Sequence, residues 1–129
     1  MIVVDASVVV SALVDSGPDG SWADEILEEH DLAAPHHVLV ESMNILRRAL
    51  ISEQISSDIA SMAKGDLMAL RIELFAFEPF ADRVWELRHE TTAYDAWYVA
   101  LAETLQEPLA TLDLRLTRTS SARCRFLTP

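Results

Sequence analysis

The sequence is poor in cysteine, glycine and long apolar runs. It has one cysteine, Cys124, and three glycines among 129 residues. A single cysteine excludes an internal disulfide and a cysteine-rich zinc site, and it favours a reducing, cytoplasmic compartment. No run approaches the roughly 20 apolar residues that cross a bilayer, and no basic segment precedes the apolar N-terminus, so neither a membrane anchor nor a signal peptide is expected. Because half of the residues are hydrophobic, we expect one ordered domain, 1–129.

Positive charge is also scarce. Ten basic residues stand against 21 acidic ones, which gives a net charge of −11. This is the wrong sign for a protein that grips nucleic acid through a broad basic face. The excess acid either forms an ordinary solubilising surface or includes carboxylates that converge and are neutralised by cations or a basic partner. Charge alone does not choose between these explanations.

Short β-branched runs alternate with longer amphipathic segments along the chain. We expect strands at 1–4, 32–35, 72–77, 108–112 and 124–127. We expect a short helix at 7–13, then a turn at 15–20 and a second helix that Ser21 caps. Further helices are expected at 37–50, 52–70, 80–89 and 91–105. Ser52, Ser56 or Ser57 caps the fourth of these helices, and Thr91 or Thr92 the last. This alternation predicts a three-layer α/β/α sandwich around a central parallel sheet of about four to five strands.

Four carboxylates occur in apolar surroundings where solubility does not require them. Asp5 and Asp113 follow predicted strands, and Glu41 and Asp95 lie in apolar helices. Each has an ordinary explanation: a helix cap for Asp5, a favourable helix N-terminus for Asp95, an exposed helix position for Glu41 and a turn for Asp113. Together, however, they would repel one another without a cation. Converging carboxylates are the ligands that Mg²⁺ and Mn²⁺ prefer, and such a site can hydrolyse phosphodiesters.

Three polar residues are placed to support these carboxylates. Ser7 follows Asp5 by two residues, and Thr111 precedes Asp113 by two. Asn44 shares a helix face with Glu41. Ordinary capping or packing explains each of the three equally well.

The arginines are unevenly distributed, and a group of them follows Asp113. Arg48, Arg115 and Arg118 are candidates for contacts to RNA phosphates, although pairing with surface acids explains each one alone. The histidines, His37 among them, are given no role because a hard cation needs no imidazole. The tryptophans are expected in the core or in dimer contacts.

Four segments resemble the acidic motifs of PIN domains, in the same order and with similar spacing. They are MIVVDAS, VESMNIL, YDAWYVALA and LATLD, and the closest resemblance is to VapC-type toxins of bacterial toxin–antitoxin pairs. On this resemblance, Asp5, Glu41, Asp95 and Asp113 match the acidic positions, and Ser7 and Thr111 match the hydroxyl positions beside the first and last. One departure is Leu116, where relatives often have an aromatic residue, and this affects packing more than chemistry.

The resemblance implies a PIN-like fold and Mg²⁺- or Mn²⁺-dependent endoribonuclease activity, commonly on tRNA or rRNA. It also implies a homodimer and a cognate VapB-like antitoxin whose basic segment occupies the acidic cleft. Two other classes remain open. A phospho-acceptor signalling module would use Asp5, but Ser7 stands where a phosphatase of that type has a second Asp, and the only lysine, Lys64, lies in a predicted helix. A non-catalytic PIN-like binding protein would keep the scaffold without the activity.

Overall fold

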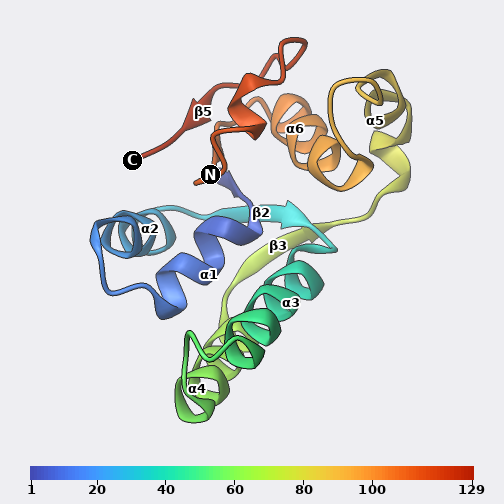
Figure 1. Cartoon of the computed structure of the whole chain (residues 1–129). Helices are drawn as coiled ribbons and strands as arrows, with labels where there is room; N and C mark the ends of the chain where they lie inside the picture. Colours follow the sequence, from blue (N-terminus) through green and yellow to red (C-terminus); the bar gives the residue numbers. More distant parts are fainter.

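Five short strands form one parallel sheet at the centre of the molecule. The computed structural model describes residues 1–129 (Figure 1). The strands are β1 (Ile2–Val4), β2 (Leu32–Pro35), β3 (Ile72–Phe75), β4 (Leu109–Ala110) and β5 (Phe126–Leu127). Their order is β3-β2-β1-β4-β5, and every neighbouring pair is parallel. The predicted parallel sheet is confirmed, and it has five strands.

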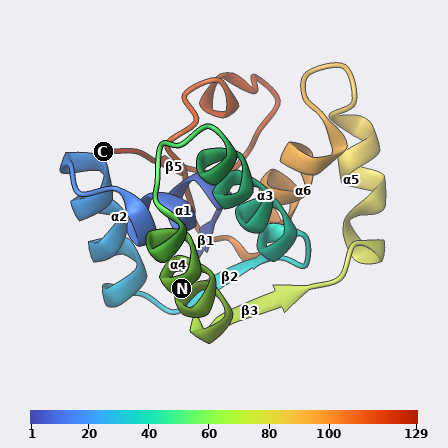
Figure 2. The ribbon, with the colours of Figure 1, turned by 60° about the horizontal axis from the view of Figure 1, so that its bottom comes forward.

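Helices cover both faces of this sheet and complete the three predicted layers. They are α1 (Ala6–Val14), α2 (Pro18–Glu29), α3 (Val38–Ile51), α4 (Ser57–Ala69), α5 (Ala81–Glu86) and α6 (Ala93–Leu105), with 3₁₀ turns η1 (Glu78–Phe80) and η2 (Leu116–Arg118). The connections from β1 to β2 and from β2 to β3 run in one direction across the sheet, so right-handed crossovers place α1 to α4 on one face. The connection from β3 to β4 runs back, and α5 and α6 lie on the other face. Figure 2 shows α1, α3 and α4 in front of the sheet.

The burial of the strands explains their composition. Ile2, Val3 and Val4 are fully buried. Helix α6 packs on one face of β1 and the layer that contains α1 covers the other, so both faces of the strand need apolar side chains. No helix in the structure has both the length and the apolar character that crossing a membrane requires.

The direction of the crossovers reverses between β1 and β4, which are neighbours in the sheet. A crevice forms at such a switch point, outside the carboxyl ends of the strands, and ligands of α/β proteins bind there. Asp5 directly follows β1, and Asp113 follows the end of β4 by three residues. The topology therefore brings two of the predicted site residues to the same edge of the sheet.

The start of α2 differs from the prediction. The helix begins at Pro18, with Gly17 as its N-cap, so Ser21 lies inside the helix and does not cap it. The Asp15 carboxylate accepts a hydrogen bond from the Gly17 N–H at 2.8 Å. Gly20 lets the first helical turn approach the Asp15 carbonyl, since a Cβ on Gly20 would lie 1.9 Å from that oxygen. The Gly-Pro pair that indicated a turn also opens a helix, because proline is well suited to the first helical position.

The remaining elements agree with the prediction except at their ends. The segment 52–70 gives α4 only from Ser57, and Ser56 is its cap, accepting from the Ile59 N–H at 3.2 Å. Of the two threonines considered, Thr92 caps α6. The helix expected at 80–89 is shorter, since α5 ends at Glu86.

A partly buried ion pair fixes the C-terminal segment to the helical layer. Arg83 Nε donates to Glu103 Oε1 at 2.8 Å, and Arg83 Nη2 donates to the Ser121 carbonyl at 2.7 Å. The backbone N–H of Arg123 donates to Glu103 Oε2 at 2.7 Å. These bonds hold the loop between β4 and β5, which carries Asp113, against α5 and α6.

Candidate active site

Asp5 is the most deeply buried of the four predicted carboxylates, and 6% of the residue is exposed. Its Oδ1 accepts from the Val8 N–H at 3.2 Å and from the Ser7 hydroxyl at 2.5 Å, and its Oδ2 accepts from the Thr111 hydroxyl at 2.5 Å. The bond from Val8 makes Asp5 the N-cap of α1, so the capping role is confirmed. Burial raises the pKa of Asp5 to about 6 against the lowering effect of these bonds, and the charge of Asp113 adds to the increase.

Two hydroxyl groups connect the ends of β1 and β4. The Ser7 hydroxyl accepts from the Leu112 N–H at 3.0 Å, and the Thr111 hydroxyl accepts from the Asp113 N–H at 2.9 Å. Each hydroxyl also donates to Asp5, so each one ties the first carboxylate to the loop that carries the last. Ser7 and Thr111 therefore lie where the sequence placed them, beside the first and last acidic positions.

Glu41 lies in the first turn of α3 and is held by aromatic residues. Its Oε2 is 3.5 Å from the Tyr98 hydroxyl, and its Oε1 touches His37 Nε2. The contact with His37 lacks hydrogen-bond alignment, and both of its atoms are buried without another partner. The His37 ring is stacked on Trp97, with centroids 4.7 Å apart and planes inclined by 5°. Through Tyr98 and Trp97, α6 thus determines where the Glu41 carboxylate lies.

Asp95 lies in the first turn of α6. Burial raises the pKa of its carboxyl group, Arg115 lowers it, and the charges of Glu41 and Asp113 raise it. Arg115 Nη2 lies 3.5 Å from Asp95 Oδ2 and 3.2 Å from Asp113 Oδ2. The guanidinium therefore stands between two of the predicted carboxylates and bridges them.

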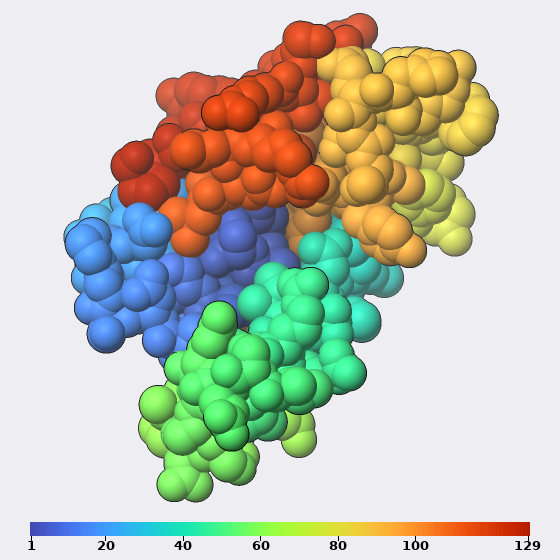
Figure 3. All heavy atoms as spheres, viewed as in Figure 1, coloured from blue at the N-terminus to red at the C-terminus, as the bar shows by residue number.

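The four carboxylates lie near one another, and Asp5 and Asp113 follow neighbouring strands at the carboxyl edge of the sheet, beside a hollow in the surface. In Figure 3 the N-terminal segment, in blue, is visible at the bottom of this hollow, between α3 in green and the orange segment after β4. Their charges act on one another, since Asp113 affects the pKa of Asp5, and Glu41 and Asp113 affect that of Asp95. With the side chains in these positions, no three of the acidic, histidine or cysteine residues form a cluster that could hold a metal ion.

The donor chemistry nevertheless fits a hard divalent cation. All four groups offer carboxylate oxygens, the ligands that Mg²⁺ and Mn²⁺ prefer. Glu41 Oε1 is buried without a hydrogen-bond donor. Arg115 already places positive charge between Asp95 and Asp113. Asp5, Glu41, Asp95 and Asp113 are therefore the residues that could hold such a cation.

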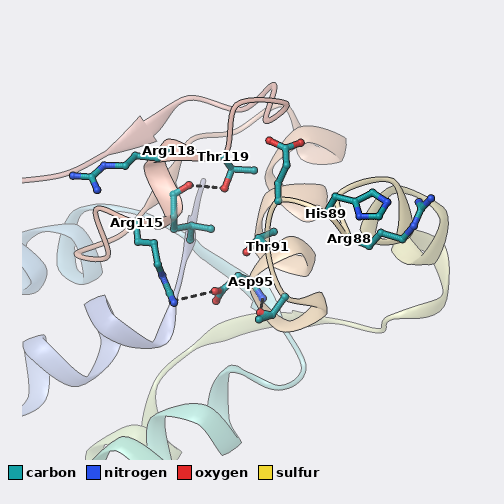
Figure 4. Close-up of a pocket in the computed structure, with 10 residues that line it drawn as sticks. Arg88, His89, Thr91, Asp95, Arg115, Arg118 and Thr119 are labelled. Atoms are coloured by element: carbon teal, nitrogen blue, oxygen red, sulfur yellow. Dashed lines mark hydrogen bonds and ion pairs between the residues drawn. The ribbon is translucent and has the colours of Figure 1, made fainter.

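A polar cleft of about 600 Å³ opens beside Asp95. One wall is the segment 88–95, and the other is the segment 115–119. Figure 4 shows Arg115 reaching toward Asp95, Arg118 on the same wall as Arg115, and Arg88 and His89 on the opposite wall. The cleft thus joins the carboxylates to a region rich in basic side chains.

Two predicted residues lie away from this arrangement. Asn44 is exposed and lines a groove with Met43 and Met68, and it makes no hydrogen bond to any of the four carboxylates. Arg48 is exposed, two turns along α3 from Glu41, and forms no ion pair. Their supporting and RNA-binding roles stay predictions. Leu116 is buried in the core, as expected of a packing residue.

Sequence reasoning missed the aromatic residues around Glu41 and the far wall of the cleft. Spacing gives a signal for two of them: His37 precedes Glu41 by four residues, and Tyr98 follows Asp95 by three, so each pair shares a helix face. Nothing in the local sequence distinguishes Arg88 or His89, which meet the site only through the fold. Trp97 was expected in the core or at a dimer contact, and it packs on His37 inside the monomer.

Comparison with known proteins identifies the family of this chain. The family model described as PIN domain matches residues 2–121. The chain is 39% identical to Ribonuclease VapC1 of Mycobacterium tuberculosis over 125 residues, which cover 96% of this chain and 94% of that protein. It is 36% identical to Ribonuclease VapC9 of the same species over 124 residues, with the same shares covered.

Solved structures share the fold at low sequence identity. The crystal structure of M. tuberculosis VapC20, described as a Sarcin-Ricin loop cleaving toxin, has a TM-score of 0.72 at 18% identity and full coverage of both chains. VapBC2 from Rickettsia felis, bound to a DNA fragment from its promoter, has a TM-score of 0.67 at 17% identity, covering 99% of this chain and 98% of that one. The model match and the sequence identities establish that this chain belongs to the PIN-domain family and, within it, to the VapC group.

Proposed function

We propose that this chain is a Mg²⁺- or Mn²⁺-dependent endoribonuclease and the toxin of a toxin–antitoxin pair, acting as one cytoplasmic PIN domain, 1–129. The observation that carries the proposal is the set of four carboxylates around the crevice between β1 and β4. It is supported by 39% identity to a protein named Ribonuclease VapC1. Asp5, Glu41, Asp95 and Asp113 are the proposed ligands and catalytic residues.

A divalent cation, when bound, supplies Lewis-acid chemistry at the scissile phosphate and makes water more acidic. The protein contributes position and charge. Asp5, anchored by Ser7 and Thr111, is the fixed point of the ligand set. Hydrolysis adds the hydroxyl group of water to phosphorus, breaks the bond from phosphorus to the leaving oxygen of the chain, and gives the remaining proton of water to that oxygen.

The proposed substrate is RNA, with tRNA or rRNA as the first candidates. A solved relative is described as cleaving the sarcin-ricin loop. The basic residues beside the carboxylates give an otherwise acidic chain a place to hold phosphates, since contacts to phosphate position a nucleic acid without reading its sequence. Arg48, Arg115 and Arg118 are the proposed contacts.

The proposed partners are a VapB-like antitoxin and a second copy of this chain. Structural neighbours include VapBC2 from Rickettsia felis and FitAcB from Neisseria gonorrhoeae. A net charge of −11 suits a basic inhibitory segment. Exposed apolar residues on α3 and α4 offer a surface for either partner: Val40, Leu50, Ile51, Ile59, Met62 and Met68. Co-purification with the product of a small neighbouring gene, with loss of cleavage in the complex, tests the antitoxin.

The geometry disfavours a phospho-acceptor role for Asp5. Both of its oxygens already accept hydrogen bonds, and the residue is almost fully buried. An acceptor carboxylate must turn one oxygen onto phosphorus, which would break these bonds, whereas a metal ligand can use the second lone pair that a hydrogen-bonded oxygen retains.

The decisive experiment is sequencing of RNA 5′ ends after expression of the wild type, Asp5→Asn and Asp95→Asn, repeated with purified protein in Mg²⁺ or Mn²⁺. We expect discrete new ends with the wild type and none with either variant. Asp24→Asn is the matched control, because it makes the same chemical change at an exposed position on α2. Cleavage at the wild-type rate by Asp5→Asn or Asp95→Asn would sink the assignment of the site.

A further inference from the structure

Arg115 is the one arginine or lysine that contacts any of the four carboxylates. Its Nη2 lies 3.2 Å from Asp113 Oδ2 and 3.5 Å from Asp95 Oδ2. Its backbone N–H donates to Asp113 Oδ1 at 3.0 Å, which fixes the start of the side chain. The side chain itself is 79% exposed. The guanidinium is thus tethered at its base and free to turn at its tip.

The guanidinium occupies the place that a cation shared by Asp95 and Asp113 would need. The guanidinium and the cation would use the same two oxygens, Asp95 Oδ2 and Asp113 Oδ2. A divalent cation and Arg115 therefore compete. The pairs that Arg115 makes are exposed and therefore weak. A doubly charged ion that also reaches Asp5 and Glu41 has the stronger attraction for this set.

The released side chain has a place to go. Arg115 lines the polar cleft of about 600 Å³, together with Arg118, Thr91 and Thr119. In Figure 4, Arg115 stands where the cleft meets Asp95. Arg118 makes no ion pair that would cancel its charge. A planar guanidinium that enters this space is suited to a phosphodiester, which it can hold through two parallel hydrogen bonds.

We propose that Arg115 changes partner when a divalent cation binds: without the ion it bridges Asp95 and Asp113, and with the ion it holds an RNA phosphate in the adjoining cleft. The proposal rests on the proposed function and adds a coupling to it. The ion then both completes the carboxylate site and releases a phosphate-binding residue. Arg115 consequently holds a phosphate only when the divalent cation is bound.

The first test measures binding of Mn²⁺ to the purified protein without RNA, by electron paramagnetic resonance of the free ion. Arg115→Gln should bind Mn²⁺ roughly threefold to tenfold more tightly than the wild type, because an exposed competing pair has been removed. Arg118→Gln is the matched control, since it loses the same charge from the same turn without losing a carboxylate partner. Arg115→Lys keeps the charge and should stay near the wild type. An unchanged affinity in Arg115→Gln, or an equal gain in Arg118→Gln, overturns the proposal.

The second test measures cleavage of the mapped RNA at saturating Mn²⁺. In Arg115→Gln the KM should rise by about threefold to tenfold, the effect of losing one charged phosphate contact, while kcat changes less. Arg71→Gln, at the opposite edge of the sheet, controls for net charge. An unchanged KM in Arg115→Gln overturns the second step and therefore the proposal. If the wild type binds Mn²⁺ but cuts no RNA, the proposed function is wrong instead. The Mn²⁺ affinities of Arg115→Gln and the wild type then still show whether Arg115 competes with the ion.

Discussion

The carboxylate site has an inner half and an outer half, and they are built differently. The inner half is the junction of β1 and β4, where Asp5 is almost fully buried and receives three hydrogen bonds from within the protein. The outer half is the rim formed by α3, α6 and the loop after β4, where Glu41, Asp95 and Asp113 are partly exposed. At the rim, Asp95 and Asp113 share the exposed guanidinium of Arg115, and Glu41 contacts Tyr98 and His37.

Because of this difference, we expect the junction to be rigid and the rim to adapt to what binds there. A buried carboxylate with a raised pKa is costly to the folded protein while it is ionised, and only a dense set of donors keeps it in one position. A half-exposed carboxylate can exchange an arginine for a cation at little cost. We therefore expect changes at the junction to affect both stability and activity, and changes at the rim to affect mainly binding.

The largest effect is expected for Asp5→Asn, which should lose activity but gain stability. The loss of activity should exceed the roughly 10- to 100-fold effect of removing a supporting partner. Folded Asp5 titrates at about 6 and its ordinary pKa is 3.8, so the folded state holds a proton that the unfolded state releases between these values. The free energy of unfolding of the cation-free wild type should therefore fall as pH rises from about 4 to about 6, and remain lower above it.

At pH 7.5 in a chelator, Asp5→Asn should be more stable than the wild type by about 2 to 3 kcal/mol. Urea unfolding at pH 4.5 and 7.5 measures the difference, which should shrink at the lower pH. The free energy of unfolding of Asp24→Asn should match that of the wild type at both pH values. A variant less stable than the wild type at pH 7.5 would show that the ionised carboxylate is well satisfied by its three donors, and the contrast between junction and rim would fail.

Thr111→Val tests the support of the junction. Valine has a similar shape, and Thr111 is fully buried, but Asp5 Oδ2 and the Asp113 N–H each lose their hydrogen bond. We expect destabilisation of about 1 to 3 kcal/mol from the unpaired groups and a Mn²⁺ affinity weaker by about 10- to 100-fold. Thr104→Val, on the exposed side of α6, is the control. If Thr111→Val bound Mn²⁺ as tightly as the wild type, the hydrogen bond from Thr111 to Asp5 would not be needed for metal binding.

The sequence predicts the junction better than the rim, for a physical reason. Asp5 interrupts an apolar run, and local pattern alone shows that the charge is out of place. The strand order is not local, yet the alternation of strands and helices predicts that Asp5 and Asp113 share an edge, which the structure bears out. The hydrogen bond from Thr111 to Asp5 joins residues 106 positions apart; spacing placed Thr111 beside Asp113, but nothing in the local sequence indicated that its hydroxyl would bind Asp5.

At the rim, long side chains meet through tertiary packing that leaves little trace in local sequence. The bridge from Arg115 to Asp95 depends on how the loop after β4 lies over α6. The stack of His37 on Trp97 depends on where α3 crosses α6. The start of α2 was predicted wrongly for another reason. The same residues, Gly17 and Pro18, favour both a turn and the start of a helix.

His37→Gln tests the rim on the α3 side. The change removes the stacking on Trp97 but leaves a polar group near Glu41, which also keeps its contact with Tyr98. Mn²⁺ affinity should therefore weaken by about tenfold or less, the low end for a supporting partner, with little change in stability. His37→Ala should weaken it further. His36→Gln alters the exposed neighbour and should have no effect, and equal effects at the two positions would contradict a specific role for His37.

The smallest effects are expected at the outermost arginines, Arg48 and Arg118. Neither forms an ion pair in the structure, so replacing either with Gln leaves no acid unpaired and should not alter stability. If each contacts one phosphate, its loss should raise the KM for RNA by about twofold to threefold and reduce the slope of log affinity against log salt by roughly 0.7. Arg71→Gln, which removes a charge from the far edge of the sheet, should leave the slope unchanged. Equal slopes for all three variants would mean that the acidic surface acts only through its total charge, and that RNA meets the protein through the carboxylate site and Arg115 alone.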